Sequence, residues 1–300
     1  MDLCNPKEIK ARLGRHGFHF SKSKGQNCLI QSWVPQQAVE ASGAATGVGV
    51  LEIGPGIGPL TAQLAQRGEK VAAVELDATL LPILAETMAP YPNVEIVPGD
   101  ILKLDLPAFC REHFPGLPVV VCANLPYNIT TPVITALLQS QCFQAVTVMI
   151  QREVAKRICA QPGTAEYGAF TLLCQYYAQG EVLFDVPPSC FLPAPTVTSS
   201  VIRMTVREAP PVPVGDPPLF PGGAGGLCPA KKDAKQQFVI LLDGFCRKRG
   251  GYPSPSGLQF DGDDSWGAPH FCRLCPINGK TPRNPGKLGI VTCIKSCKGL

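Results

Sequence analysis

The chain contains the stretch Leu51-Glu52-Ile53-Gly54-Pro55-Gly56-Ile57-Gly58 at its first predicted turn from a strand to a helix. Its glycines allow the backbone to turn sharply and to approach a bound ligand closely. The spacing departs from the G-x-G-x-x-G pattern of dinucleotide sites, so a cradle for a pyrophosphate fits poorly. The stretch therefore predicts an α/β fold that binds an adenosine-type ligand without phosphates.

The flanking sequence alternates between short apolar runs and helical segments. Strands are predicted over Val48–Ile53, Lys70–Val74, Val94–Val97, Val119–Ala123, Ala145–Ile150, Val182–Val186 and Val197–Val206. Helices are predicted around Pro59–Gln66, Thr79–Met88, Pro132–Leu138, Glu153–Ile158 and Ala169–Ala178. Such alternation is typical of a mainly parallel sheet with helices on both faces. No helix of useful length separates the last two strands, so we expect them to form an antiparallel hairpin at the end of a seven-stranded sheet.

Acidic residues follow the second and third predicted strands. Glu75 lies about twenty positions after the glycines, where a carboxylate accepts hydrogen bonds from both hydroxyls of a ribose. Asp100 is suited either to accept from an adenine amino group or to cap the helical turn that begins at Ile101. Because these groups and the glycines all follow strands of one sheet, together they predict S-adenosylmethionine as the cofactor.

The tetrapeptide Asn124-Leu125-Pro126-Tyr127 follows the apolar run Val119–Ala123. The Asn124 amide oxygen and the Leu125 carbonyl can both accept hydrogen bonds from one exocyclic amino group. Pro126 restricts the backbone and so aims that carbonyl, while Tyr127 offers a flat face on which a base can stack. Taken alone, the tetrapeptide is equally well explained as a turn with an asparagine cap.

The composition is that of a core-forming protein of one or two domains, with 300 residues and 45% hydrophobic side chains. No apolar run is long enough to cross a bilayer, and the first fifteen residues contain no signal-peptide core, so we expect a cytoplasmic protein. Eight cysteines between Cys4 and Cys190 are scattered singly, which is typical of reduced thiols. We expect His16, His19 and His113 to be surface residues rather than catalysts.

Charge divides the chain near Phe220. Residues 1–220 contain 15 Lys and Arg against 18 Asp and Glu, a net charge of −3, whereas residues 221–300 contain 12 against 5, a net charge of +7, and no Glu. The predicted organisation is an N-terminal access segment and lead helix (1–46), a catalytic domain (47–207), a proline-rich linker (208–220) and an aberrant, disordered tail (221–300). Because residues 1–220 have a negative net charge, we expect them to bind nucleic-acid phosphates weakly.

Further stretches complete a set of motifs: Gly25-Gln26-Asn27-Cys28-Leu29, Gln151-Arg152-Glu153-Val154-Ala155, Tyr167-Gly168 and Phe191-Leu192-Pro193-Ala194-Pro195-Thr196-Val197. From about Phe18 to Phe220, the set resembles the ribosomal RNA adenine N6,N6-dimethyltransferases that act on the small subunit, although Cys28 replaces an aromatic residue. The resemblance implies a Rossmann-like class I S-adenosylmethionine-dependent methyltransferase fold. It also implies cofactor contacts and a target adenine held between Tyr127 and Phe191. The implied cofactor contacts are Asn27, Leu29, Gly54, Gly56, Glu75, Asp100 and Asn124.

The activity implied by the resemblance is dimethylation of two adjacent adenines in a small-subunit rRNA hairpin, with a role in ribosome assembly. Its expected partner is the pre-30S particle, and the enzyme is expected to be a monomer. A sulfonium methyl group is already electrophilic, so the site needs positioning more than a strong base, and we predict no general base. Two alternatives stay open: a large-subunit adenine methyltransferase of the antibiotic-resistance type, and a non-catalytic assembly factor.

The sequence after Phe220 departs from the basic stretch with which the family's small helical C-terminal domain begins. When the codons for residues 220–235 are reread one nucleotide later, they can encode Phe-Arg-Val-Val-Arg-Ala-Ala-Phe-Ala-Gln-Arg-Arg-Lys-Thr-Leu, which matches that stretch. Because the shifted frame leaves mainly the middle base of each codon free, agreement over this length is not expected by chance. We therefore hypothesise a frameshift near Phe220, either natural or a sequencing error.

The cysteines of the tail permit a second interpretation. Cys272, Cys275, Cys293 and Cys297 approach the spacing of a structural zinc site. The frameshift accounts for these cysteines without a function, so the prediction is that the chain carries no metal site.

Overall fold

The computed structural model describes residues 2–18 and 27–209. One structural unit comprises the described residues up to Ala160 together with Ala169–Ala209, and it carries the whole candidate site. The tail, nearly all of the linker, Met1 and residues 19–26 of the access segment, including His19, lie outside the described residues.

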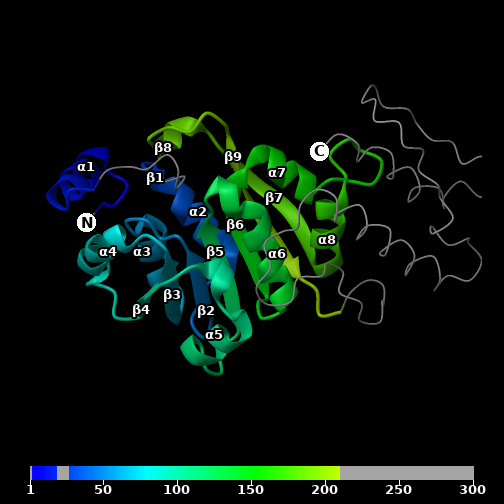
Figure 1. The fold of residues 1–300 in the computed structure, drawn as a ribbon, viewed down its shortest axis with the longest axis horizontal. Helices are drawn as coiled ribbons and strands as arrows, with labels where there is room; N and C mark the ends of the chain where they lie inside the picture. Colours follow the sequence, from blue (N-terminus) through cyan, green and yellow to red (C-terminus); the bar gives the residue numbers. More distant parts are fainter. Residues whose placement is uncertain (1, 19–26, 210–300) are drawn as a thin grey trace, which may run out of the picture. The chain divides into compact units, whose positions relative to one another are not determined.

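A seven-stranded sheet forms the centre of this unit (Figure 1). Its strands lie in the order β4-β3-β2-β5-β6-β9-β7. The first five are parallel, whereas β9 runs antiparallel to both β6 and β7, which confirms the predicted sheet and terminal hairpin. The strands are β2 (Gly49–Ile53), β3 (Lys70–Glu75), β4 (Val94–Pro98), β5 (Val119–Asn124), β6 (Ala145–Gln151), β7 (Ala178–Val186) and β9 (Ser199–Val206).

Helices cover both faces of the sheet. All five residues of β2 and all but the last of β5 are buried, and successive side chains of a strand point to opposite faces, so neither face is open to solvent there. The helices are α1 (Pro6–Arg15), α2 (Trp33–Ser42), α3 (Pro59–Ala65), α4 (Leu81–Met88), α5 (Leu106–His113), α6 (Thr130–Ser140), α7 (Arg152–Ile158) and α8 (Ala169–Tyr177). None of the helices in the described ranges is long and apolar enough to cross a membrane.

Short elements complete the strand-to-helix turns. They are the 3-10 turns η2 (Ala78–Leu80), η3 (Ile101–Lys103), η4 (Tyr127–Ile129) and η5 (Pro188–Cys190), and the two-residue strands β1 (Cys28–Leu29) and β8 (Phe191–Leu192). β1 and β8 pair antiparallel, with Cys28 opposite Leu192 and Leu29 opposite Phe191. This pairing joins the access segment to the Phe191 loop.

The element boundaries differ from the predicted ones chiefly at the hairpin and at α5. β7 begins at Ala178, four residues before the predicted start, because its early residues pair with the end of β9. Helix α5 was not predicted: its N-cap Asp105 accepts a hydrogen bond from the Ala108 backbone N–H at 3.0 Å. A single capping side chain thus starts a helix whose apolar pattern is too short to read.

The strand order places the site. From β2 the chain builds the sheet outward through β3 to β4, and then returns to add β5 on the other side of β2. Ligands of open α/β sheets bind at such a reversal, outside the carboxyl ends of the strands. The glycine turn after β2 and the tetrapeptide after β5 therefore face the same crevice.

Candidate active site

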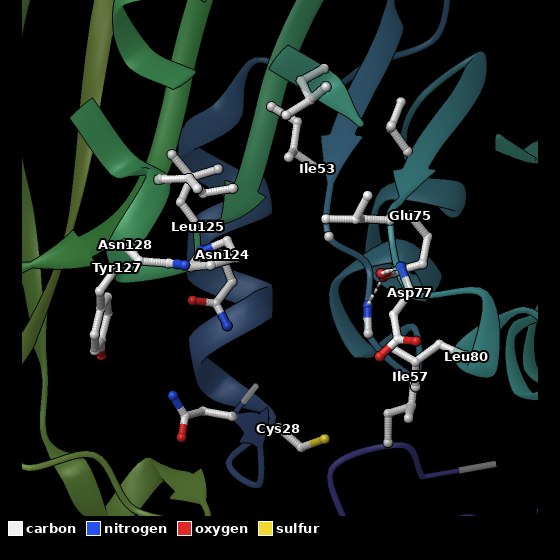
Figure 2. A pocket seen from close by; sticks show the side chains of 18 of the residues that line it. Cys28, Ile53, Ile57, Glu75, Asp77, Leu80, Asn124, Leu125, Tyr127 and Asn128 are labelled. Carbon is white, nitrogen blue, oxygen red and sulfur yellow. Dashed lines mark hydrogen bonds between the residues drawn. The ribbon is translucent and has the colours of Figure 1, made fainter. Parts of the chain in front are cut away.

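A cavity of about 290 Å³ opens at the carboxyl ends of β2, β3 and β5. Ten of the eleven predicted site residues line it. Besides Pro126 they are Asn27, Gly54, Gly56, Glu75, Asp100, Asn124, Leu125, Tyr127 and Phe191. In Figure 2, Glu75 and Asp77 lie on one side of the cavity, and Asn124 and Tyr127 lie on the other. The site therefore has two walls, one from each half of the sheet.

Leu29 is the predicted site residue that does not line this cavity. Its side chain is buried in the hydrophobic core together with Val34 and Phe191. In the described structure Leu29 is a packing residue. It supports the strand pair between the access segment and the Phe191 loop.

The glycine turn is held in a conformation that favours glycine. Gly54, Gly56 and Gly58 have φ angles of 67°, 64° and 93°, which L side chains rarely adopt. The Gly54 N–H donates to the Val74 carbonyl at 2.9 Å, which ties the turn to β3. A Cβ built on Gly56 would meet no atom within 4 Å, so the space beside this residue is free. The backbone thus leaves room for a ligand to approach it directly.

Glu75 ends β3 with a carboxylate that the backbone already orients. Its Oε1 accepts from the Asp77 N–H at 2.8 Å, and its Oε2 accepts from the Gly56 N–H at 3.4 Å. Burial raises the pKa of this carboxyl, while the two backbone donors act to lower it. Each oxygen keeps a further lone pair that can accept a hydroxyl from a ligand.

Asp100 caps a helical turn and also lines the cavity. One carboxylate oxygen accepts from the Leu102 N–H at 3.1 Å and so caps η3. The other oxygen lies 3.8 Å from the exposed Lys103 ammonium. Because Asp100 also lines the cavity, capping fixes the carboxylate at its wall.

The tetrapeptide after β5 is fixed by backbone contacts. The Leu125 N–H donates to the Met149 carbonyl at 3.1 Å, and the Thr130 hydroxyl donates to the Pro126 carbonyl at 3.1 Å. Leu125 is buried and anchors the turn in the core. No group among the described residues bonds the Asn124 side-chain amide, which lines the cavity. The amide is therefore free to bind a ligand.

Aromatic side chains reach the same wall from two distant segments. Tyr127 follows the tetrapeptide's proline, and its hydroxyl lies 2.7 Å from the Ser199 Oγ. Phe191 is almost fully buried in β8 and also lines the cavity. The two predicted aromatic residues thus share one cavity, although they lie more than sixty positions apart in the sequence.

Several cavity residues were missed by sequence reasoning. Leu76 directly follows Glu75 and is 69% exposed, which is unusual for a large apolar side chain. Asp77 is nearly buried and accepts hydrogen bonds from the Thr79 N–H and hydroxyl. The position of Leu76 next to the acid at the end of a strand was a usable signal. The other missed lining residues are Phe18, Cys28, Ile53, Ile57, Val74, Leu80, Gly99, Ile101, Asn128 and Ile129.

Glu52 is an unexpected buried acid behind the glycine turn. Its side chain is 1% exposed, and Oε2 has no hydrogen-bond partner among the described residues. Burial raises the pKa of this carboxyl to about 8; the Thr61 hydroxyl opposes the rise and the nearby Glu75 adds to it. Glu52 is therefore mostly protonated at neutral pH and does not add negative charge to the cofactor wall.

The histidines of the described residues lie outside the cavity lining. His16 lies 3.1 Å from the Glu86 carboxylate, and His113 lies 3.1 Å from the Glu95 carboxylate. The His113 side chain is 13% exposed and its ring lies tilted against Phe109, so this histidine is partly buried. No cluster of potential metal ligands occurs within residues 2–18 and 27–209, while the four tail cysteines lie outside them.

Comparisons with known proteins agree with this geometry. A family model described as ribosomal RNA adenine dimethylase matches residues 17–221. The ribosomal RNA small subunit methyltransferases A of Shouchella clausii and Geobacillus thermodenitrificans are each 48% identical over 221 residues, which cover 73% of this chain and 75% of each relative.

Two solved structures share the fold with 27% sequence identity. A dimethyladenosine transferase from Plasmodium falciparum aligns with a TM-score of 0.54 over 60% of this chain and 63% of that chain, which is less than two thirds of its length. The 23S rRNA methyltransferase ErmE aligns with a TM-score of 0.53 over 62% of this chain and 72% of that chain.

Proposed function

The chain belongs to the ribosomal RNA adenine dimethylase family, and we propose that it transfers methyl groups from S-adenosylmethionine to N6 of two adjacent adenines in small-subunit rRNA. The observation that carries this proposal is the single cavity with two walls. The cofactor acceptors, Glu75 for the ribose and Asp100 for the adenine amino group, lie on the β3–β4 side, and the acceptors for the target amino group, Asn124 and Leu125, lie on the β5 side. A cofactor and a target base can thus meet between them.

The residues of the first wall fit S-adenosylmethionine. The open space beside Gly56 admits a ligand to the backbone, and the buried, pre-oriented Glu75 carboxylate supplies ribose acceptors. Asp100 supplies a fixed acceptor for the adenine amino group, and Asn27 and Gly54 complete this wall. When bound there, S-adenosylmethionine supplies an electrophilic methyl group on a sulfonium.

The residues of the second wall prepare the nucleophile. In an adenine, the N6 lone pair is delocalised into the ring. The Asn124 amide oxygen and the Leu125 carbonyl accept the two N6 hydrogens, which favours a pyramidal nitrogen whose lone pair faces the methyl group. Tyr127 and Phe191 hold the ring, and stacking offsets the few kcal/mol needed to take a base out of its helix. Position, rather than a general base, thus carries the reaction.

Replacing Asn124 tests this mechanism. We expect Asn124→Ala to lose methyl transfer to undermethylated small-subunit particles, while affinity for the particle is retained. The measurement is transfer of radiolabelled methyl groups, with particle binding followed by filter retention. Retained methylation in Asn124→Ala would contradict the role of Asn124. Particle binding without any methyl transfer by the unchanged protein would support the alternative, a non-catalytic assembly factor.

The choice of subunit is decided by a second assay. The small-subunit relatives are 48% identical over 221 residues, and this similarity favours the small subunit. We expect methylation of small-subunit particles but not of large-subunit RNA. Preferential methylation of a large-subunit adenine would overturn the choice.

The setting of the reaction follows from the same proposal. The chain acts on rRNA, and we place it in the cytoplasm, as a monomer on the pre-30S particle, because rRNA is methylated during assembly there. Light scattering of the purified protein and sedimentation with particles at successive assembly stages test these points. A stable dimer, or binding to mature subunits alone, would contradict them.

The domain organisation also enters as a proposal, with residues 221–300 read in a shifted frame. Its support is that the family match ends at residue 221, near the change in charge and composition. Sequencing the gene across codon 220 tests it, as does comparison with a repaired-frame protein, which we expect to methylate particles faster. Stoichiometric zinc in the purified chain would favour the zinc site instead.

A further inference from the structure

Tyr127 is held by the backbone turn that precedes it and by the hydroxyl at the tip of its ring. At the backbone end, the Pro126 carbonyl accepts from the Thr130 hydroxyl at 3.1 Å and from the Ile129 N–H at 3.2 Å. At the other end, the phenol oxygen lies 2.7 Å from Ser199 Oγ, across 72 positions of sequence. A tyrosine ring has two rotatable bonds, so fixing the tip leaves it little freedom to turn.

Ser199 is itself enclosed by the central sheet. Its side chain is fully buried at the start of β9, which lies between β6 and β7. In register it stands beside Gln151 on one neighbouring strand and Val186 on the other. The preceding residue, Thr198, accepts a hydrogen bond from the Arg152 N–H at 3.0 Å. The serine is therefore a rigid anchor on the central sheet.

We infer that Ser199 is a positioning residue, which holds the Tyr127 ring in the orientation needed to receive the target adenine. The inference rests on the proposed function of the cavity, and it adds a residue that does not line the cavity. The cost of ordering the ring is met on folding rather than on binding, because the anchor exists without any base present. The Tyr127 ring is thus oriented before the RNA binds.

A matched set of variants isolates the contact. Ser199→Ala removes the anchor, and Tyr127→Phe removes the phenol oxygen but keeps the aromatic face. Ser200→Ala is the control, because the Ser200 hydroxyl bonds Asp185 at 2.5 Å instead. We expect Ser199→Ala and Tyr127→Phe each to lower kcat roughly 3- to 10-fold, in line with the loss of one hydrogen bond, with cofactor affinity unchanged.

The double variant decides between anchoring and independent effects. Because the two groups act through one contact, Ser199→Ala with Tyr127→Phe should lose no more activity than either change alone. Additive losses, or wild-type kcat in Ser199→Ala, would overturn the inference. An inactive wild type would instead count against the proposed function itself.

A spectroscopic measurement tests the anchor without activity. In protein labelled with ¹³C at the tyrosine ring, the Tyr127 signal is assigned by its loss in Tyr127→Phe. Burial raises the pKa of the Tyr127 phenol and the bond to Ser199 lowers it, so Ser199→Ala should move its titration to higher pH. Ser200→Ala should leave the signal in place. An unchanged Tyr127 signal in Ser199→Ala would contradict the inference.

Discussion

Gly54 faces Pro126 where the cofactor turn meets the target-binding tetrapeptide: a Cβ on Gly54 would lie 4.0 Å from Pro126 Cδ. A side chain at position 54 would therefore reach van der Waals contact with the tetrapeptide.

Replacing Gly54 by alanine should lower both the stability of the protein and its affinity for the cofactor. The residue has a φ of 67°, so Gly54→Ala should cost about 1–2 kcal/mol in the free energy of unfolding. It should also weaken S-adenosylmethionine binding, because the new methyl group enters the cavity. Calorimetric titration and thermal unfolding measure the two effects.

The control is Gly116→Ala. Gly116 has a φ of 75° and free space around it, but does not line the cavity. Gly116→Ala should lose a similar amount of stability and keep full affinity for S-adenosylmethionine. Equal losses of affinity in both variants would contradict a direct role for Gly54.

Glu75→Gln should weaken cofactor binding about 10- to 100-fold, because hydrogen bonds to a charged acceptor contribute roughly 1.5–3 kcal/mol. The amide nitrogen of glutamine would also face one of two backbone donors, from Gly56 and Asp77. Titration with S-adenosylhomocysteine measures the change. Glu69→Gln provides the control, since this exposed acid accepts a single backbone N–H from Gly47.

Glu52→Gln should flatten the dependence of stability on pH. In the unfolded chain this carboxyl loses its proton near pH 4.5, whereas in the folded protein it keeps it until about pH 8. The folded state thus binds more protons between these values, and stability falls as pH rises through the window. Glutamine mimics the protonated acid and removes this decline.

Chemical denaturation from pH 5 to pH 9 checks the Glu52 prediction. The variant should approach wild-type stability at pH 5 and exceed it at pH 8. Parallel curves for the two proteins would show that Glu52 is ionised in the folded state.

Replacing either aromatic residue by leucine should reduce kcat/KM for RNA. Loss of one stacking face costs about 1–3 kcal/mol, which corresponds to roughly a 5- to 150-fold reduction for Tyr127→Leu or Phe191→Leu. Affinity for S-adenosylmethionine should persist in Tyr127→Leu. Phe184→Leu is the control, because Phe184 packs on Trp33 and does not line the cavity. Equal activity in all three variants would exclude stacking.

Sequence alone predicted the sheet, its parallel part and the cofactor, because these depend on local patterns. Gly54, Glu75 and Asn124 could be placed together, since each follows a strand and parallel strands end at one crevice. Leu76 was missed because an apolar side chain after a strand is normally expected in the core, although its position next to Glu75 was a usable signal. Whether a residue such as Leu29 lies in the cavity or in the core depends on how side chains pack around it.

The contact between Tyr127 and Ser199 was beyond sequence reasoning for a different reason. It requires β9 to lie between β6 and β7, an order that no local pattern specifies. The pairing of Leu29 with Phe191 is likewise a property of tertiary structure.

Because β9 separates β6 from β7, the sheet cannot be completed in the order in which its strands leave the ribosome. β7 is synthesised first but has no partner until the residues of β9 emerge and bind β6. The Tyr127 ring gains its anchor only at that moment. A nascent chain can therefore assemble its cofactor wall early, while its target wall stays unfinished until residue 206 has been translated.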